Sequence, residues 1–104
     1  MIYVLNAPVV TNYGLYRFVK ITAEEAKGIL SKEFVSAVGH ESTAMLMSGM
    51  IGADIPFNRI TIHMEAGDKA VALWLIDRPG EAQVYSVEDL AAVNCELGLL
   101  ERLE

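Results

Sequence analysis

The stretch best suited to acid–base chemistry is residues 35–43, Val-Ser-Ala-Val-Gly-His-Glu-Ser-Thr. A short apolar run reaches a glycine and then His40 where a helix is expected to begin, because Ser42 and Thr43 favour helix starts. Free backbone N–H groups at a helix start attract anions, so a phosphate could be held beside the imidazole. Gly39 would let such a ligand come close to the backbone. The alternative is an ordinary, partly buried histidine that begins a core helix.

Other polar residues in the chain could join His40 in a site. Asn6 and Ala7 follow the apolar run of residues 1–5. Loops that leave a strand often contact ligands, although a plain turn is the alternative. Arg59 stands at the entrance of another strand-like run, where it could clamp a phosphate or be an ordinary surface arginine.

A polar loop later in the chain carries Arg78 and Glu81. Cleaving an RNA phosphodiester without a metal requires a group that orients the 2′-hydroxyl, a proton donor to the leaving 5′-oxygen and stabilisation of phosphoryl charge. A histidine can donate the proton, an arginine can hold phosphoryl oxygens and a glutamate can orient the histidine. The alternative for Arg78 and Glu81 is a solvent-exposed ion pair that stabilises the fold very little.

Hydrophobic patterning predicts the elements that would position these residues. Strands are expected at residues 1–5, 16–21, 35–38, 60–64 and 70–76, with a last edge strand at 99–103. Helices are expected at residues 23–30, 42–51 and 86–94. This pattern predicts a single α/β domain spanning residues 1–104, with a mixed sheet of about five strands covered by helices.

Local signals place the ends of these elements. Thr22 and Glu25 have the spacing of a capping box, and Gly52 and Gly98 are read as helix ends. Residues 66–69, Ala-Gly-Asp-Lys, predict a hairpin turn that pairs the strand at 60–64 with the strand at 70–76. The second of these strands is apolar on both faces and should be central. His63 falls on the opposite side of its strand from Ile60, Ile62 and Met64 and should face solvent.

Composition excludes several classes of function. A net charge of −6 argues against coating long nucleic acid, which requires a basic face. No metal-ligand spacing, membrane-length apolar run or signal peptide is present, so a metal-independent cytoplasmic protein without cofactors is expected. Cys95 should be a buried structural thiol. The methionines at 45, 47 and 50 fit core or dimer packing better than an adaptable binding surface.

Several short elements occur in order along nearly the whole chain. They are Tyr-Val-Leu-Asn-Ala at 3–7, Ser-Ala-Val-Gly-His-Glu-Ser-Thr at 36–43, Asn-Arg-Ile at 58–60, Gly-Asp-Lys at 67–69, Arg78 followed by Glu81, and Leu-Gly-Leu-Leu-Glu at 97–101. With these elements the chain resembles the small viral and phage ring nucleases, a type III anti-CRISPR family formerly described as a domain of unknown function.

That resemblance implies a homodimer whose copies form one symmetric pocket for cyclic tetra-adenylate, the second messenger of type III CRISPR effectors. Cleavage to linear di-adenylate would silence the defence nucleases. Carried over by residue, His40 would be the general acid, Glu81 its partner or a second acid–base group, and Arg78 a phosphate or transition-state contact. The residues that would hold the ring are Asn6, Ala7, Gly39, Ser42, Thr43 and Arg59.

A second reading belongs to a different class of protein. The dimer could sequester the cyclic nucleotide without cleaving it, or dock on a protein partner through its methionine-rich surface. Pro79 and Gly80 lie between Arg78 and Glu81 and would set how far Glu81 reaches toward His40. If that loop does not close, binding survives while catalysis fails.

Overall fold

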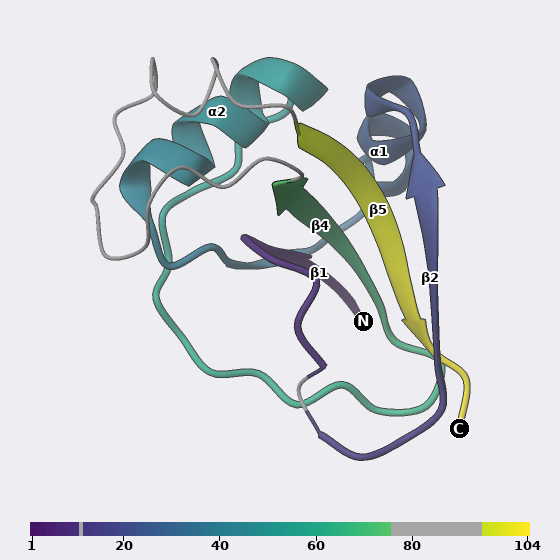
Figure 1. Cartoon of the computed structure of the whole chain (residues 1–104). Coiled ribbons are helices and arrows are strands. Elements are labelled where there is room, and N and C mark those ends of the chain that lie inside the picture. Colours follow the sequence, from purple (N-terminus) through teal and green to yellow (C-terminus); the bar gives the residue numbers. More distant parts are fainter. Residues whose placement is uncertain (11, 76–94) are drawn as a thin grey trace.

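The computed structural model describes residues 1–10, 12–75 and 95–104 (Figure 1). In chain order, the elements within these ranges are β1 (Ile2–Leu5), β2 (Tyr16–Ile21), α1 (Ala23–Ile29), β3 (Val35–Ala37), α2 (Glu41–Ile51), β4 (Lys69–Leu75) and β5 (Cys95–Arg102). The helix predicted at 86–94 lies outside the described residues. Neither described helix is long and apolar enough to cross a membrane.

The strands form one mixed sheet in the order β2-β5-β4-β1-β3. β1 runs parallel to both β3 and β4, whereas β5 runs antiparallel to both β2 and β4. β4 lies in the middle, as predicted from a run without a polar face, and Ala70, Val71, Ala72 and Leu73 are all buried. The prediction of an α/β fold with a mixed five-stranded sheet is confirmed.

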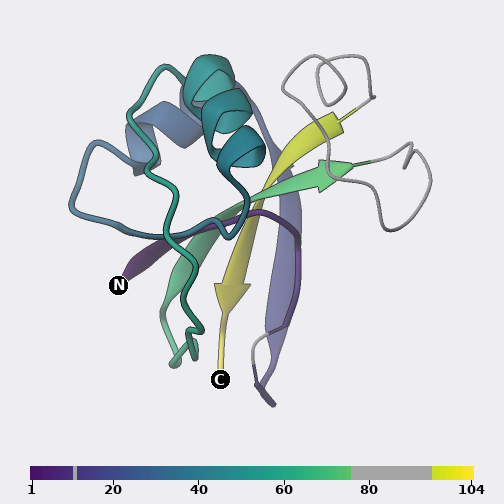
Figure 2. The same ribbon diagram turned by 90° about the vertical axis from the view of Figure 1, so that its left-hand side faces the viewer.

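Each face of the sheet has its own core. Val71 and Leu73 of β4 pack with residues of both helices, including Ala26 and Met47, so the helices cover that face. Both helices lie on the same side of the twisted sheet (Figure 2). Ala70 and Ala72, which alternate with the first pair, face a second cluster that contains Leu5 and Met64. Residues 57–64 supply Ile62 and Met64 to that cluster and thus cover part of the other face.

Both helices begin and end where local chemistry favours it. The Thr22 hydroxyl accepts a hydrogen bond from the Glu25 N–H at 3.1 Å, and the Glu25 carboxylate accepts one from the Thr22 N–H at 3.2 Å. This confirms the predicted capping box of α1. Gly52 ends α2 with a left-handed φ of 77°, as predicted. α2 begins one residue earlier than predicted, because His40 occupies the cap position and its carbonyl accepts the Ala44 N–H at 3.0 Å.

The prediction of a strand at 60–64, paired in a hairpin with 70–76, is wrong. The turn itself forms, with Gly67 at a φ of 92° and the Asp68 carboxylate accepting the Glu65 N–H at 2.8 Å. However, both edges of β4 are occupied by β1 and β5, so no edge remains for the preceding segment. Residues 57–64 therefore cross the sheet as an extended segment that is not part of a strand (Figure 1). Within it, Ile60 is 45% exposed rather than buried, and His63 is exposed as predicted.

The predicted edge strand at 99–103 is also corrected. β5 starts earlier, at Cys95, and lies inside the sheet between β2 and β4. Gly98 does not end a helix; it lies within β5, where a Cβ atom would be 2.3 Å from atoms of the Phe18 ring. Because Gly98 has no side chain, it leaves room for the aromatic ring of Phe18 on the neighbouring strand.

Candidate functional site

The candidate site forms where two parallel strands end side by side. Leu5 of β1 pairs with Ala37 of β3, so the residues that follow each strand emerge at the same edge of the sheet. There the Gly39 N–H donates a hydrogen bond of 3.4 Å to the side-chain oxygen of Asn6, 33 positions away in the chain. Ligands of open α/β sheets commonly bind at the carboxyl ends of parallel strands. The two loops that the sequence predicts to contact a ligand are therefore neighbours.

His40 lies at the entrance of α2, directly after this contact. It has an extended backbone conformation and makes no side-chain cap hydrogen bond, and the residue is exposed. The N–H groups of the first helical turn have no intrahelical acceptors, and the His40 side chain does not supply one. An exposed imidazole beside such donors can transfer a proton to or from a bound anion.

The first turn of α2 orients its two hydroxyl residues differently. Ser42 is half-buried, whereas Thr43 is only 8% exposed. Together with Ala44, Thr43 forms part of the buried side of the helix. Backbone N–H groups rather than the Thr43 hydroxyl are thus the donors that a ligand would meet at this end of α2.

Arg59 approaches the site from the other side. A Cβ atom added to Gly39 would lie 3.4 Å from Cγ of Arg59, so the aliphatic stem of this arginine packs over the glycine. The close approach that Gly39 permits is therefore taken up, in this structure, by a side chain of the protein itself. Arg59 is exposed overall, which leaves its guanidinium group available for an anion.

Two polar residues that the sequence reasoning did not assign hold these segments together. The Asn58 side chain donates a hydrogen bond to the Ser36 carbonyl at 2.8 Å, and the Ser36 hydroxyl donates one to the Pro56 carbonyl at 2.6 Å. Ser36 interrupts the apolar run that forms β3, and this break was the signal that could have drawn attention to it.

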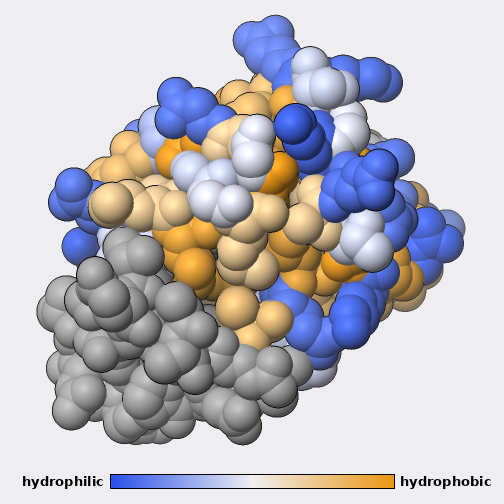
Figure 3. Space-filling model, turned by 90° about the horizontal axis from the view of Figure 1, so that it is seen from above, coloured by the Kyte–Doolittle hydropathy of each residue, from blue (hydrophilic) through white to orange (hydrophobic). Residues whose placement is uncertain are grey.

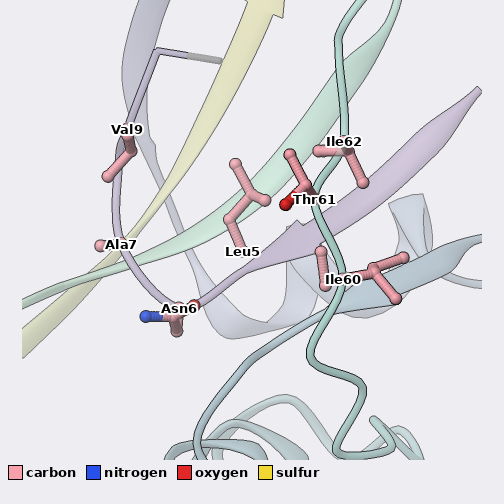
Figure 4. Close-up of a pocket in the computed structure, with 8 residues that line it drawn as sticks. Leu5, Asn6, Ala7, Val9, Ile60, Thr61 and Ile62 are labelled. Carbon is pink, nitrogen blue, oxygen red and sulfur yellow. The ribbon is translucent and has the colours of Figure 1, made fainter.

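An apolar hollow of about 240 Å³ adjoins Asn6. It lies between the end of β1 and residues 60–62, with the side chains of Leu5 and Thr61 pointing toward one another (Figure 4). Its lining consists of Leu5, Asn6, Ala7, Val9, Ala37, Ile60, Thr61 and Ile62. Asn6 and Thr61 are the polar side chains in that set, so the hollow is suited to a mostly apolar group with a few hydrogen-bonding atoms.

The structure thus brings together most of the predicted site residues. Asn6 and Ala7, the turn at Gly39 and His40, and Arg59 share one edge of the sheet. Arg78 and Glu81 lie outside the described residues. Among the described residues, no group of three or more His, Cys, Asp or Glu side chains could hold a metal ion.

The fold and this edge define a small α/β domain with a candidate anion-binding and acid–base site at the ends of parallel strands. A family model described as STIV B116-like matches residues 2–97, and the chain belongs to that family. It is 33% identical to ORF117, an uncharacterized protein of Acidianus two-tailed virus, over 111 aligned residues covering 100% of this chain and 95% of that protein.

Further relatives come from a second virus and from a bacterium. The chain is 36% identical to protein 26 of a Sulfolobus islandicus filamentous virus, with 97% of this chain and 91% of that protein covered. It is 34% identical to YddF of Bacillus subtilis, with 96% and 95% covered. The fold is similar to B116 of Sulfolobus turreted icosahedral virus, with a TM-score of 0.72, 19% identity, and 97% and 98% of the two chains covered.

Proposed function

We propose that this protein is a metal-independent ring nuclease that binds cyclic tetra-adenylate across a homodimer and cleaves it to linear di-adenylate. The observation that carries the proposal is the contact between Asn6 and Gly39, which brings a strand-end loop against the helix start that bears the exposed His40. The ordered motifs shared with the ring nucleases support the same reading. Arg59, packed over Gly39, adds a cation at this edge.

The proposed reaction is attack of a ribose 2′-oxygen on the adjacent phosphorus. The new 2′-O–P bond forms as the P–O5′ bond breaks, which leaves a 2′,3′-cyclic phosphate on one side and a 5′-hydroxyl on the other. His40 donates a proton to the departing 5′-oxygen, while the attacking 2′-hydroxyl gives its proton to a base, a role that the family resemblance offers to Glu81 as a second acid–base group. Two cuts in a ring of four nucleotides yield two linear di-adenylates.

Hydrogen-bond donors in fixed positions stabilise the negative charge on the phosphoryl oxygens. Arg59 and the first-turn N–H groups of α2 hold these oxygens, and the family resemblance adds Arg78 for the same task. By the same resemblance Glu81 orients or tunes His40. The apolar hollow beside Asn6 takes an adenine base, whose faces are apolar and whose edges carry hydrogen-bonding groups.

A two-fold dimer matches a ring of four identical nucleotides, because each half of the ring then meets the same atoms. Binding a small polyanion in a local pocket is also compatible with a net charge of −6, since the pocket rather than the whole surface supplies the donors.

The biological role that follows is to switch off type III CRISPR signalling, in the host cytoplasm where the messenger is made. Relatives encoded by two viruses support an anti-CRISPR role. The relative in Bacillus subtilis indicates that the family also includes a protein from a cellular genome.

The test is incubation of the purified protein with labelled cyclic tetra-adenylate in excess chelator, followed by separation of the products. Wild type should yield linear di-adenylate, and His40→Ala should lower the rate by about 100-fold or more while still binding the ring. His63→Ala is the matched control, because it removes the other exposed histidine, and it should cleave normally.

If the ring stays intact in the wild-type reaction, the protein is not a nuclease for this substrate. A binding titration on the same samples then separates the alternatives. Tight binding without turnover would select a protein that sequesters the messenger, and absence of binding would favour a protein-interaction module.

A further inference from the structure

We infer that Ser36 and Asn58 form a polar clamp that positions His40 and Arg59 relative to each other. The inference rests on the proposed function for its catalytic consequence, and on hydrogen bonds in the described residues for its geometry.

Asn58 donates hydrogen bonds to the outer edge of β3, where no further strand of the described residues pairs. β3 is an edge strand that pairs with β1, so its outer carbonyl groups need other donors. The Asn58 backbone N–H donates to the Val38 carbonyl at 2.9 Å, and its side-chain amide donates to the Ser36 carbonyl at 2.8 Å. One asparagine thus satisfies two alternate carbonyls of the same edge.

Ser36 completes the clamp from the β3 side. Its side chain is buried, and the hydroxyl donates to the Pro56 carbonyl at 2.6 Å while accepting the Val38 N–H at 3.4 Å. Pro56 and Asn58 are therefore held by hydrogen bonds to residues 36–38, which lie just before Gly39 and His40 in the chain. A buried hydroxyl that both donates and accepts a hydrogen bond is costly to disturb.

The clamp links the two halves of the candidate site. Arg59 follows Asn58 directly and packs over Gly39, and His40 follows Gly39. Residues 60–62, the wall of the apolar hollow, come next in the chain. Loosening the clamp should therefore shift Arg59 and the hollow away from His40 without removing any group that touches the ring. Asn58 is a positioning residue in this account, not a catalytic one.

The first experiment needs no ligand. Asn58→Asp keeps the size of the side chain but cannot donate to the Ser36 carbonyl, so amide hydrogen exchange should accelerate at Gly39 and Ala44, the two hydrogen-bonded amides that flank His40. An acceleration of about tenfold or more is expected, since local opening of a few hydrogen bonds changes exchange on that scale. Ser36→Ala should accelerate the same amides and serves as the second variant if Asn58→Asp does not fold.

Ser48→Ala is the matched control. Its hydroxyl accepts the Ile55 N–H at 3.0 Å and donates to the Ala44 carbonyl at 2.8 Å, so it ties the same connection to α2 three residues before Asn58. In this variant exchange should accelerate at Ile55 and leave Gly39 unchanged. If Ser48→Ala and Asn58→Asp accelerated exchange at Gly39 equally, the proposal of a clamp would be contradicted. The acceleration would then reflect a general loss of stability.

The second experiment uses cyclic tetra-adenylate under single-turnover conditions. Asn58→Asp should lower the cleavage rate constant by about 10- to 100-fold, because small misplacements of reacting groups have effects of that size. The Kd should rise by less than about tenfold, which is less than on removal of Arg59, because Arg59 and the hollow are displaced but still present. A rate equal to that of Ser48→Ala at the same folded fraction would overturn the positioning role. If wild type does not cleave the ring, the proposed function fails, and the exchange experiment still decides whether the clamp exists.

Discussion

At the scale of single residues, Arg59 is the cation whose loss should weaken binding most directly. Arg59→Ala should raise the Kd for cyclic tetra-adenylate by about 10- to 100-fold, since charge-assisted hydrogen bonds contribute about 1.5 to 3 kcal/mol. Arg59→Lys should recover only part of this affinity, because lysine lacks the planar fork. Isothermal titration at constant ionic strength measures both values.

The control for this prediction is Lys32→Ala, which removes the same charge from another exposed position. It should leave the Kd within about twofold of wild type, as expected for an exposed charge away from the bound anion. Equal losses in Lys32→Ala and Arg59→Ala would indicate a non-specific charge effect and would contradict a local phosphate contact.

A second residue-scale prediction concerns Glu101 of β5. Arg17 donates a hydrogen bond to its carboxylate at 2.7 Å, and this bond, with smaller contributions from the charges of Arg17 and Lys69, holds the pKa of Glu101 below its ordinary value of 4.5. A carboxyl whose pKa is lower in the folded state stabilises the fold above the unfolded-state pKa, and this stabilisation is lost as pH falls through the folded-state pKa.

Arg17→Met should therefore lower the free energy of unfolding by no more than about 1 kcal/mol at pH 7, because Arg17 is 59% exposed. The difference from wild type should shrink below pH 4.5 and vanish once Glu101 is protonated. Urea unfolding between pH 7 and pH 2 measures it. A difference that persists at the acid end would mean that Arg17 stabilises β2 by packing rather than by charge.

At the scale of elements, Gly98 and Phe18 should behave as one unit. Gly98→Ala places a methyl group 2.3 Å from the Phe18 ring, and overpacking of this kind costs about 1 to 3 kcal/mol of unfolding free energy. Phe18→Leu alone should also destabilise, but the double variant should be more stable than the sum of the single effects predicts. Additive losses in thermal or urea unfolding would rule out the contact.

Gly28 supplies the control with the opposite sign. It lies in α1 with nothing within 4 Å of an added Cβ. Gly28→Ala should therefore raise the free energy of unfolding by about 0.5 to 1 kcal/mol through better helix propensity. If both glycine variants lost stability, the loss would be a general effect of an added methyl group and not a specific effect of the contact with Phe18.

The elements differ in how far local sequence predicts them. β1, β2, both helices and β4 carry patterns or caps that depend on neighbours in the chain, and their predicted bounds are close to the observed ones. The strand at 60–64 was predicted from alternation alone, but alternation does not reveal that β1 and β5 already occupy both edges of β4. For β5, Gly98 was read as a helix end because the ring it accommodates belongs to a strand far away in sequence.

The same distinction applies to the site. Asn6, His40 and Arg59 were recognised by residue type and by their places at element ends. Ser36 and Asn58 were not assigned roles, because their partners are backbone carbonyls of distant segments rather than other polar side chains. Ser36 leaves a weak signal, because it interrupts the apolar run of β3, but a single sequence does not show which distant carbonyl accepts its hydrogen bond.

At the scale of the whole molecule, apolar surface remains exposed. Met47 is buried in the core, whereas Met45 on the same helix is 60% exposed and Trp74 of β4 is 47% exposed. On the face seen from above, apolar residues gather among hydrophilic ones (Figure 3). The predicted methionine packing is thus confirmed for Met47, whereas Met45 lies outside the core.

The proposed homodimer makes a quantitative prediction about binding. If one symmetric pocket holds the ring, titration of the inactive His40→Ala protein should give one cyclic tetra-adenylate per two chains. Light scattering on the same sample should give a mass near 23 kDa, about twice the 11.4 kDa of one chain, before and after the ring is added. Linear tetra-adenylate is the control ligand, and it should bind more weakly because it is not held in the bound shape beforehand.

Two chains per ring also set the net charge that the polyanionic ligand meets. Two chains bring a formal charge of about −12 to one ring, so binding must depend on a few donors at the shared edge rather than on a basic surface. The logarithm of the affinity should then fall only gently with the logarithm of salt concentration, with a slope of about −1 to −3 for two to four ionic contacts. One ring per chain, or a monomer that binds as tightly as the dimer, would contradict the shared pocket, since every contact would then have to come from a single copy of the β1 and β3 edge.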